Sequence, residues 1–384
     1  MLIDTRRIRK ISVRRSAAVV RTALAVALAL TTLGGLNGCG NSNGSSSSSH
    51  VAYVAGGQKS ISAFLVNDGS GKVSMPVGSP YVAGNSPSSV VVHPSGQFVY
   101  VANQADSSIS LFTADPSNGS LTEVLPRSAG FGASPAFMTM DATGHFLFVA
   151  NQGSNDVWSF QVGAGGVLTP VSSTPVGSAP GGLLLTPSGF LIVPVPNFSD
   201  IAVLSVSNSG LLHFVGSFPV SNGVGGVARA PAAPQTINGV VQPPTPGFVY
   251  ATNPSGGTVS VFTLQSGGTL QPLPALTVAA GATPKAAAVD LSGKFLYVVN
   301  AGSGDVSQYK IDQASGALTP FSAATVGAGA NPGFIVTDPH AKFVYVGDAG
   351  AQSVMQFSMN SDGSLASKST ISPGFSPSSL AASP

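Results

Sequence analysis

The chain has 384 residues, of which only 8% are charged, and it contains 47 glycines and 29 prolines. Such a composition leaves little material for solvent-exposed helices and favours strands joined by tight turns. Seven of the sixteen basic residues lie within the first 21 positions, and from Cys39 onward nine basic residues face thirteen acidic ones, so this mildly acidic body argues against a nucleic-acid partner, whose phosphates need clustered Lys and Arg.

The amino-terminal segment has the pattern of an export signal. Residues 1–21 are basic, and Thr22–Leu36 (TALAVALALTTLGGL) is apolar and uncharged. A basic region followed by an apolar one is typical of secretory signals. The alternative, a membrane-spanning helix, needs roughly 20 apolar residues, and this stretch is shorter.

The end of this segment resembles the lipobox of bacterial lipoproteins, with Leu36 and Gly38 just before the cleavage point and Cys39 just after it. The resemblance implies that residues 1–38 are a lipoprotein signal peptide and that lipidated Cys39 makes the membrane a partner. Residues 39–50, rich in Ser, Gly and Asn, would then form a flexible tether. We therefore expect an exported, lipid-anchored protein of the bacterial cell envelope, periplasmic or on the outer surface. The alternative is that Cys39, the chain's single cysteine, is unmodified.

One phrase recurs through the rest of the chain. Its clear copies are FVYVAN (Phe98–Asn103), FLFVAN (Phe146–Asn151), FVYATN (Phe248–Asn253), FLYVVN (Phe295–Asn300) and FVYVGD (Phe343–Asp348). VAYVAG (Val51–Gly56) precedes them, and FLIVPVPN (Phe190–Asn197) is a degraded copy. The seven copies are spaced by 47, 48, 44, 58, 47 and 48 residues.

Each copy contains four strand-like segments separated by turns of Gly, Pro, Asn and Asp, as residues 86–132 illustrate. Four antiparallel strands repeated at about 40–50 residues are typical of a propeller blade. The sequence therefore predicts an all-β fold over residues 51–384, a seven-bladed β-propeller with four antiparallel strands per blade. The copies resemble the YVTN repeats of bacterial surface proteins and the lactonase-like propeller superfamily, which includes one class of 6-phosphogluconolactonases.

The two ends of the repeat region complete one another. The closing phrase SPSSLAASP (Ser376–Pro384) matches SPSSVVVHP (Ser86–Pro94), the first strand of a blade, whereas the N-terminal copy begins at a second strand. We therefore expect one blade to be closed by both chain ends, which removes an open seam. The Pro-rich insert 230–247 lengthens the fifth copy and predicts an extended loop with little regular structure.

Two kinds of residue are candidates for a binding site. The ends of the second strands should meet at one rim of the propeller and form a polar ring there. Its members are Asn103, Asn151, Asn253, Asn300 and Asp348. The alternative is that these side chains only stabilise their turns. Lys285 and Arg229 differ from the other copies and would place cations at the channel, where they could hold an anionic or carbonyl-bearing ligand.

The resemblance to lactonases transfers poorly at the level of single residues. Family enzymes commonly have Pro-Arg at the first-strand entry, a His before Pro, and Glu after the strand-two Asn. Here His93 precedes Pro94 and Lys285 stands nearest to the arginine. The residues after Asn103 and Asn151 are Gln104 and Gln152. His93, like His145 and His340, should lie at the turns opposite the rim, with no second titratable partner.

No motif for a metal or an organic cofactor is present in the sequence. The main hypothesis is a lipid-anchored binding or scaffold module for a protein or small-molecule ligand. The alternative is a lactonase-like hydrolase, related to 6-phosphogluconolactonases, that acts on a sugar lactone at the rim with Lys285 stabilising the oxyanion. A third possibility is a subunit of a surface or redox complex, so whether the protein is an enzyme stays open.

Overall fold

The computed structural model describes residues 48–231, 235–237, 240–242, 247–340 and 342–384. The predicted signal peptide, Cys39 and nearly all of the tether therefore lie outside the described residues. Within the described part, no helix has the length and apolar character needed to cross a bilayer.

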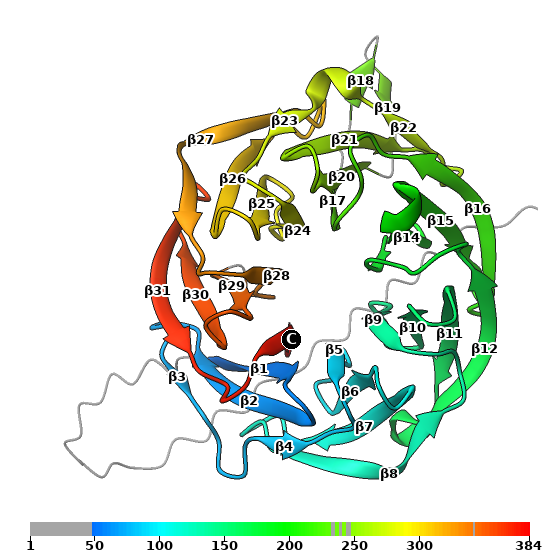
Figure 1. Ribbon diagram of the computed structural model, residues 1–384, viewed down its shortest axis with the longest axis vertical. Helices are drawn as coiled ribbons and strands as arrows, with labels where there is room; N and C mark the ends of the chain where they lie inside the picture. Colours follow the sequence, from blue (N-terminus) through cyan, green and yellow to red (C-terminus); the bar gives the residue numbers. More distant parts are fainter. Residues whose placement is uncertain (1–47, 232–234, 238–239, 243–246, 341) are drawn as a thin grey trace, which may run out of the picture. The chain divides into compact units, whose positions relative to one another are not determined.

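Seven antiparallel sheets surround a central axis, and each sheet is one blade (Figure 1). Blade 1 contains β32 and β1–β4, blades 2 to 4 contain β5–β8, β9–β12 and β13–β16, blade 5 contains β17 and β20–β23, and blades 6 and 7 contain β24–β27 and β28–β31. In blades 1 and 5 the outer strand is broken into two short pieces. The predicted all-β, seven-bladed fold is confirmed.

The elements of blades 1 to 4 have the following bounds in chain order: β1 (Ser49–Gly56), β2 (Ser60–Asn67), β3 (Val73–Ser74), β4 (Tyr81–Val82), β5 (Pro87–Val92), β6 (Phe98–Asn103), β7 (Ser108–Ala114), β8 (Leu121–Ala129), β9 (Pro135–Met140), β10 (Phe146–Asn151), β11 (Asp156–Val162), η1 (Ala164–Gly166), β12 (Leu168–Pro175), β13 (Leu184–Leu185), β14 (Phe190–Val195), η2 (Pro196–Phe198), β15 (Asp200–Val206) and β16 (Leu212–Pro219).

The remaining elements are β17 (Val227–Ala230), β18 (Gln235–Ile237), β19 (Val240–Gln242), β20 (Gly247–Asn253), β21 (Thr258–Leu264), β22 (Leu270–Pro272), η3 (Pro274–Leu276), β23 (Val278–Ala279), β24 (Pro284–Val289), β25 (Phe295–Asn300), β26 (Asp305–Ile311), β27 (Leu318–Gly327), β28 (Pro332–Thr337), β29 (Phe343–Asp348), β30 (Ser353–Met359), β31 (Leu365–Ile371) and β32 (Pro377–Ala382).

The repeated phrase forms the second strand of each blade, which is buried on both faces. In β6 every residue after Phe98 is buried, and β10 and β25 show the same pattern. A strand covered on both sides is apolar throughout and does not alternate with polar residues. The outermost strand, such as β8, faces water and is correspondingly polar.

Neighbouring blades interlock through an aromatic ring and a glycine. The first residue of the phrase packs against a glycine with positive φ in the outer hairpin of the next blade, as Phe248 does against Gly316 (φ +78°). A Cβ at that glycine would collide with the ring. The same aromatic contact recurs between Phe98 and Gly166, Phe146 and Gly210, Phe190 and Gly268, Phe295 and Gly363, and Phe343 and Gly71, and at the seventh seam the aliphatic side chain of Val51 packs on Gly119.

The tyrosine two residues later in the phrase strengthens three of these contacts. The Tyr250 hydroxyl donates to the carbonyl of Gly316 at 3.1 Å, and Tyr100 and Tyr297 bond their glycines in the same way. Burial raises the pKa of these phenols. They therefore stay protonated at physiological pH and keep the proton that the bond requires.

The ring is closed by the two ends of the described chain. β32 pairs antiparallel with β1, from Gly56 opposite Pro377 to Ala52 opposite Ala382. It forms the inner strand of blade 1, where the red C-terminal strand lies beside the blue one (Figure 1). Its Ser378 hydroxyl also lies 2.6 Å from the carbonyl oxygen of Pro87 in blade 2. The prediction that one blade is shared by both ends is confirmed.

The insert in the fifth copy differs from the expectation. Within it, β18 and β19 pair as a short antiparallel hairpin, with Thr236 opposite Val241. The prediction of little regular structure is therefore wrong for this part of residues 230–247. The five prolines between positions 231 and 246 stand outside the two strands, and this leaves the backbone N–H groups of both strands free for pairing.

Removal of Ser376–Pro384 should open the ring. The truncation exposes the inner edge of β1 and removes Leu380 from the core cluster that it shares with Val54 and Tyr345, so we expect the melting temperature to fall by roughly 10 °C or more. Deletion of residues 235–242, a hairpin that pairs with itself, is the control and should change it little. Equal melting temperatures for the two deletions would contradict a role for β32 in closure.

Gly316→Ala should destabilise the protein more than Gly96→Ala. Both glycines have positive φ, +78° and +71°, but a Cβ at Gly96 meets nothing within 4 Å, whereas one at Gly316 meets Phe248. We expect a loss of about 1 kcal/mol for Gly96→Ala from backbone strain alone, and about 2–4 kcal/mol for Gly316→Ala because overpacking is added. Denaturant unfolding of both variants measures the difference, and similar losses would show that the interlock contributes nothing.

Candidate functional site

The propeller has two ends with different chemistry. The end at which the second strands finish is called the Asn rim here and carries Asn103, Asn151, Asn253, Asn300 and Asp348. The other end, called the turn face, carries the turns between first and second strands, including His93, Asp141, Asp290 and Asp338. The two ends are treated in turn below.

The residues of the predicted polar ring point into their own blades. Their exposed fractions are 0% or 1%. The amide of Asn103 donates to the hydroxyls of Ser108 and Ser110, both at 3.1 Å, and its Oδ1 accepts the N–H of Gly84 at 2.9 Å. These side chains hold the rim loops, and the expectation that they face a ligand is corrected for this reason.

The other asparagines of the ring bond their own blades similarly. The amides of Asn151 and Asn300 donate to Asp156 and Asp305, at 2.8 Å and 2.6 Å, and that of Asn253 donates to Thr258 at 2.8 Å. Asp156 and Asp305 in the rim loops are thus hydrogen-bonded to asparagines of their own blades. The amide groups of these three asparagines point into the blades and not into the channel.

Asp348 replaces asparagine in the last copy because the groups of the rim loop that face this side chain are all backbone N–H donors. Its two oxygens accept the N–H groups of Ala330, Asn331 and Gly350 at 2.9–3.0 Å. Burial raises the pKa of Asp348, but these hydrogen bonds outweigh it and hold the pKa below its ordinary value. A lowered pKa means that the carboxylate stabilises the fold above its ordinary pKa and that this contribution is lost as the pH falls.

A pocket of about 500 Å³ opens on the Asn rim between blades 1, 2 and 3. Gln104 and Gln152 lie in it, with Nε2 of Gln104 donating to Oε1 of Gln152 at 3.0 Å, and Nε2 of Gln152 donating to the carbonyl of Pro180 at 3.0 Å. Ser88 supplies a hydroxyl and Phe137 an aromatic ring. None of the lining residues is titratable, so this pocket suits an uncharged, hydrogen-bonding ligand.

Sequence reasoning noted Gln104 and Gln152 only as departures from a family pattern. They follow the buried asparagine in two successive copies, which is the position where a side chain first turns away from the blade. The signal was therefore present in the sequence, but the neighbouring asparagines, repeated in more copies, were the more prominent feature.

The structure does not bring Lys285 and Arg229 together. Lys285 is exposed at a bulge at the start of β24, on the Asn rim, and its Nζ reaches toward Gly333 in blade 7. Arg229 pairs with Val249 toward the turn-face end of β17, and burial lowers the pKa of its guanidinium. Neither residue lines the pocket of blades 1 to 3.

His93 lies on the turn face and is occupied on both ring nitrogens. Nδ1 lies 3.0 Å from the N–H of Ser95, and Nε2 lies 3.2 Å from the carbonyl oxygen of Gly144 in the next blade. An imidazole that accepts at one nitrogen and donates at the other has no lone pair left for a general base. His93 therefore bridges blades 2 and 3.

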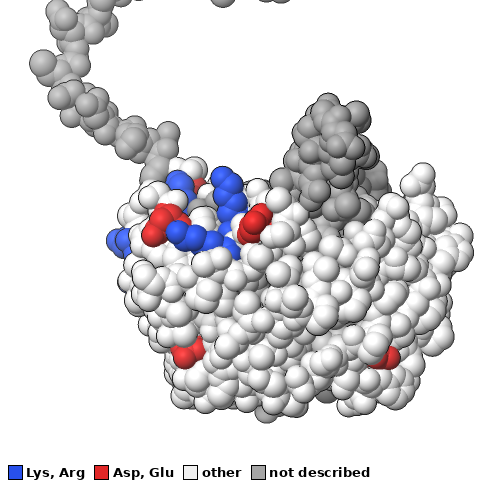
Figure 2. Space-filling model, turned by 90° about the horizontal axis from the view of Figure 1, so that it is seen from above, with Lys and Arg blue, Asp and Glu red and all other residues white. Residues whose placement is uncertain are grey.

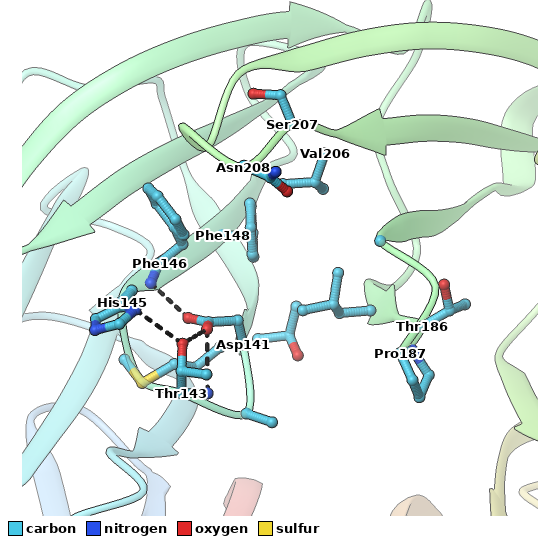
Figure 3. Close-up of a pocket in the computed structure, with 15 residues that line it drawn as sticks. Asp141, Thr143, His145, Phe146, Phe148, Thr186, Pro187, Val206, Ser207 and Asn208 are labelled. Atoms are coloured by element: carbon cyan, nitrogen blue, oxygen red, sulfur yellow. Dashed lines mark hydrogen bonds between the residues drawn. The ribbon is translucent and has the colours of Figure 1, made fainter. Parts of the chain in front are cut away.

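A second pocket, of about 600 Å³, lies on the turn face between blades 3 and 4 (Figure 3). It contains a carboxylate, a hydroxyl and an imidazole in contact, because the Thr143 hydroxyl donates to Asp141 and lies 3.1 Å from Nδ1 of His145. The arrangement resembles a catalytic chain. However, Asp290 and Ser292 repeat the carboxylate–hydroxyl contact in blade 6, so it is a turn motif.

Comparison with known proteins places the fold in a family. The family model described as "Lactonase, 7-bladed beta-propeller" matches residues 45–227 and 238–331. The chain belongs to this lactonase family. No curated protein matches it.

Solved structures similar to this lactonase-family chain share its fold at low sequence identity. A putative 6-phosphogluconolactonase from Bacteroides fragilis is 21% identical, with a TM-score of 0.71, 89% of this chain and 100% of that chain covered. A periplasmic gluconolactonase from Pseudomonas aeruginosa is 20% identical, with a TM-score of 0.69 and 88% and 99% covered. The hydrazine synthase of Kuenenia stuttgartiensis is 17% identical, with a TM-score of 0.56 and 78% and 92% covered.

Asp348→Asn should destabilise this lactonase-family propeller in a pH-dependent way. The amide sets a donor against backbone donors, so we expect a loss of about 2–3 kcal/mol at pH 7. The loss should shrink as the pH falls below about 4, where the carboxyl of the unfolded chain becomes protonated, and should shrink further as the pH falls through the lowered pKa of Asp348 in the folded protein. Denaturant unfolding at both pH values measures this, with Asp200→Asn as control, because Asp200 accepts one hydroxyl from Ser217 at a solvent-exposed contact. A loss independent of pH would contradict the assignment.

Proposed function

We propose that this protein binds and hydrolyses an uncharged sugar lactone in the rim pocket of blades 1 to 3. Membership of the lactonase family supports the reaction class, and the lining of the pocket supports the substrate class. Sugars are recognised by convergent amide and hydroxyl groups together with an apolar or aromatic surface. Gln104, Gln152, Ser88 and Phe137 supply these groups in this chain, and this is the observation on which the proposal depends.

The same lining argues against a phosphorylated substrate. A phosphate ester carries a charge of about −1.5 to −2 at pH 7, and proteins usually bind it through Arg, Lys or helix N-termini. The lining of the rim pocket contains neither Lys nor Arg. The proposed substrate is therefore a sugar lactone without a phosphate group, in contrast to the substrate that the name of the Bacteroides fragilis protein implies for that protein.

Hydrolysis adds water to the lactone carbonyl and breaks the ring C–O bond, through an intermediate whose carbonyl oxygen bears negative charge. Side-chain amide N–H groups can stabilise such an oxyanion. Nε2 of Gln104 or Gln152 would serve here by exchanging its present partner for the substrate. The oxyanion role first assigned to Lys285 would require a ligand that extends across the channel from blade 6.

One observation favours a second candidate function, sugar binding without turnover. The rim pocket has no titratable side chain to activate water, and general-base catalysis commonly supplies about 10²–10⁴-fold in rate. A binding module of this kind agrees with the main hypothesis from the sequence. Lipidation at Cys39, a proposal that concerns residues outside the described part, would hold either form at the cell envelope.

The two candidates differ in turnover. We expect the full chain to hydrolyse glucono-δ-lactone above the spontaneous rate and to prefer it to the 6-phosphorylated lactone. Gln152→Leu should lower kcat/KM by about 10- to 100-fold because it removes a hydrogen-bond donor. Gln265→Leu, remote in blade 5, is the matched control and should leave kcat/KM unchanged. A pH-stat assay measures the acid released.

Saturable sugar binding without turnover, abolished in Gln152→Leu, would support the second candidate. Preference for the phosphorylated lactone, or neither binding nor turnover across a panel of neutral lactones, would overturn both.

A further inference from the structure

The seam between blades 7 and 1 carries a cluster of two histidines and two aspartates on the turn face. His50 and Asp68 come from blade 1, and Asp338 and His340 come from the turn after β28 in blade 7. Nδ1 of His50 lies 2.6 Å from Oδ1 of Asp68, Nδ1 of His340 lies 3.3 Å from Oδ1 of Asp338, and the two imidazoles stack at 5.1 Å. Neither pocket described above includes these residues.

Asp338 has lost the partner that equivalent residues have in other blades. In blades 3 and 6 the hydroxyl two residues later, of Thr143 or Ser292, donates to Oδ2 of Asp141 or Asp290. His340 replaces that hydroxyl in blade 7. Oδ2 of Asp338, which is 0% exposed, therefore has no hydrogen-bond partner among the described residues, and an unpaired buried carboxylate oxygen is costly.

His50 also departs from its counterparts. The residue before the repeated phrase is exposed in blades 2, 3, 6 and 7, for example His145 and Lys294, whereas His50 is 2% exposed. Its Nδ1 bonds to Asp68, and its Nε2 lies 3.3 Å from the Tyr345 hydroxyl. Such a carboxylate fixes the orientation of a histidine, and Nε2 would bind a ligand by exchanging the Tyr345 hydroxyl for it.

Asp68 is positioned by the interlock between the two blades. It follows Asn67 in the hairpin whose Gly71 packs on Phe343 of blade 7, and it is 2% exposed, with Oδ2 also lacking a hydrogen-bond partner among the described residues. Oδ1 of Asp68 also lies 3.9 Å from Nδ1 of His340. The cluster therefore gathers two buried carboxylates and two imidazoles at one seam.

We propose that His50, Asp338 and His340 bind a divalent transition-metal ion, with Zn²⁺ as the best match, and that Asp68 orients His50 for this role. One ligand atom from each of the three residues lies within 4.8 Å of the others. Two imidazole nitrogens and a carboxylate oxygen are a common ligand set for zinc, with water completing the coordination. His340 is 35% exposed at its side chain, which gives the ion a path of entry.

The proposed ion would cross-link the first and last blades of the ring. The chain links blade 7 to blade 1 only through β32, whereas the cluster joins His50 and His340, which are 290 positions apart in the sequence. An ion bound to the folded ring and not to the open chain stabilises the ring by mass action. His340 was expected at a turn without a second titratable partner, and its partner is His50, a residue of the expected tether.

The test is zinc binding by the full chain without an affinity tag, after removal of metal by a chelator. We expect calorimetric titration with Zn²⁺ to give one ion per chain, and about 100-fold excess of zinc over Kd to raise the melting temperature by roughly 5 °C. His340→Ala should weaken binding by more than about 100-fold and abolish the temperature shift. His213→Ala, an exposed histidine on the outer strand of blade 4, should preserve both.

Folding of the variants is checked by their melting temperatures in chelator. If His340→Ala folds poorly, His340→Gln, which keeps a polar side chain of similar length, should show the same loss of zinc binding. Co²⁺ serves as a spectroscopic probe, since visible absorption from a low-coordinate site should appear in the unchanged protein and in His213→Ala alone. Absence of stoichiometric zinc binding, or equal binding by His340→Ala, would overturn the proposal.

Discussion

The contact between an aromatic ring and a positive-φ glycine of the next blade sets the geometry of this propeller. The ring occupies the volume that a Cβ would need, and where a tyrosine follows two residues later its hydroxyl bonds the same glycine. The aromatic residue and the tyrosine of one blade lie on the same buried strand, so neither contact can shift without the other. Because an aromatic ring makes this contact at six seams and Val51 makes it at the seventh, the repeat keeps its length, and insertions such as β18–β19 occur where they leave the contact intact.

Because the interlock between blades uses the residues of the repeated phrase, residues that bind a ligand must be sought outside that phrase. The phrase that identifies the repeat consists of residues that pack against a neighbour or hold a loop, and its terminal Asn or Asp is buried for the second reason. A ligand can be recognised only by side chains outside that phrase. Gln104 and Gln152 immediately follow it on the Asn rim, and His340 precedes it on the turn face, so the candidate sites occur where copies differ.

The sequence was sufficient to predict the blades, their number and the closure by both ends, because these follow from period, alternation and a matching phrase at each end. It was not sufficient for the orientation of the rim asparagines. Asn103 is turned inward by the N–H of Gly84 and two hydroxyls of its own blade, and such contacts depend on loop coordinates. The hairpin in the insert was missed because its prolines dominate the local pattern.

The seam cluster was missed for a different reason. Closure of the ring was predicted, but not its effect on the turn face, where it brings His50 next to Asp338 and His340. In blade 1 the first and second strands come from opposite ends of the chain, so no turn joins β32 to β1 as turns join these strands in other blades. His50 lies at this interruption and is buried there, facing the turn of blade 7 that contains Asp338 and His340. The pairing of β32 with β1 closes the ring within a blade, whereas the cluster connects blade 1 to blade 7. The chain itself crosses from blade 7 to blade 1 between β31 and β32, and the cluster adds a second link, from the N-terminal strands of blade 1 to blade 7. A bound ion would therefore strengthen the ring at the one blade that is assembled from both ends of the chain.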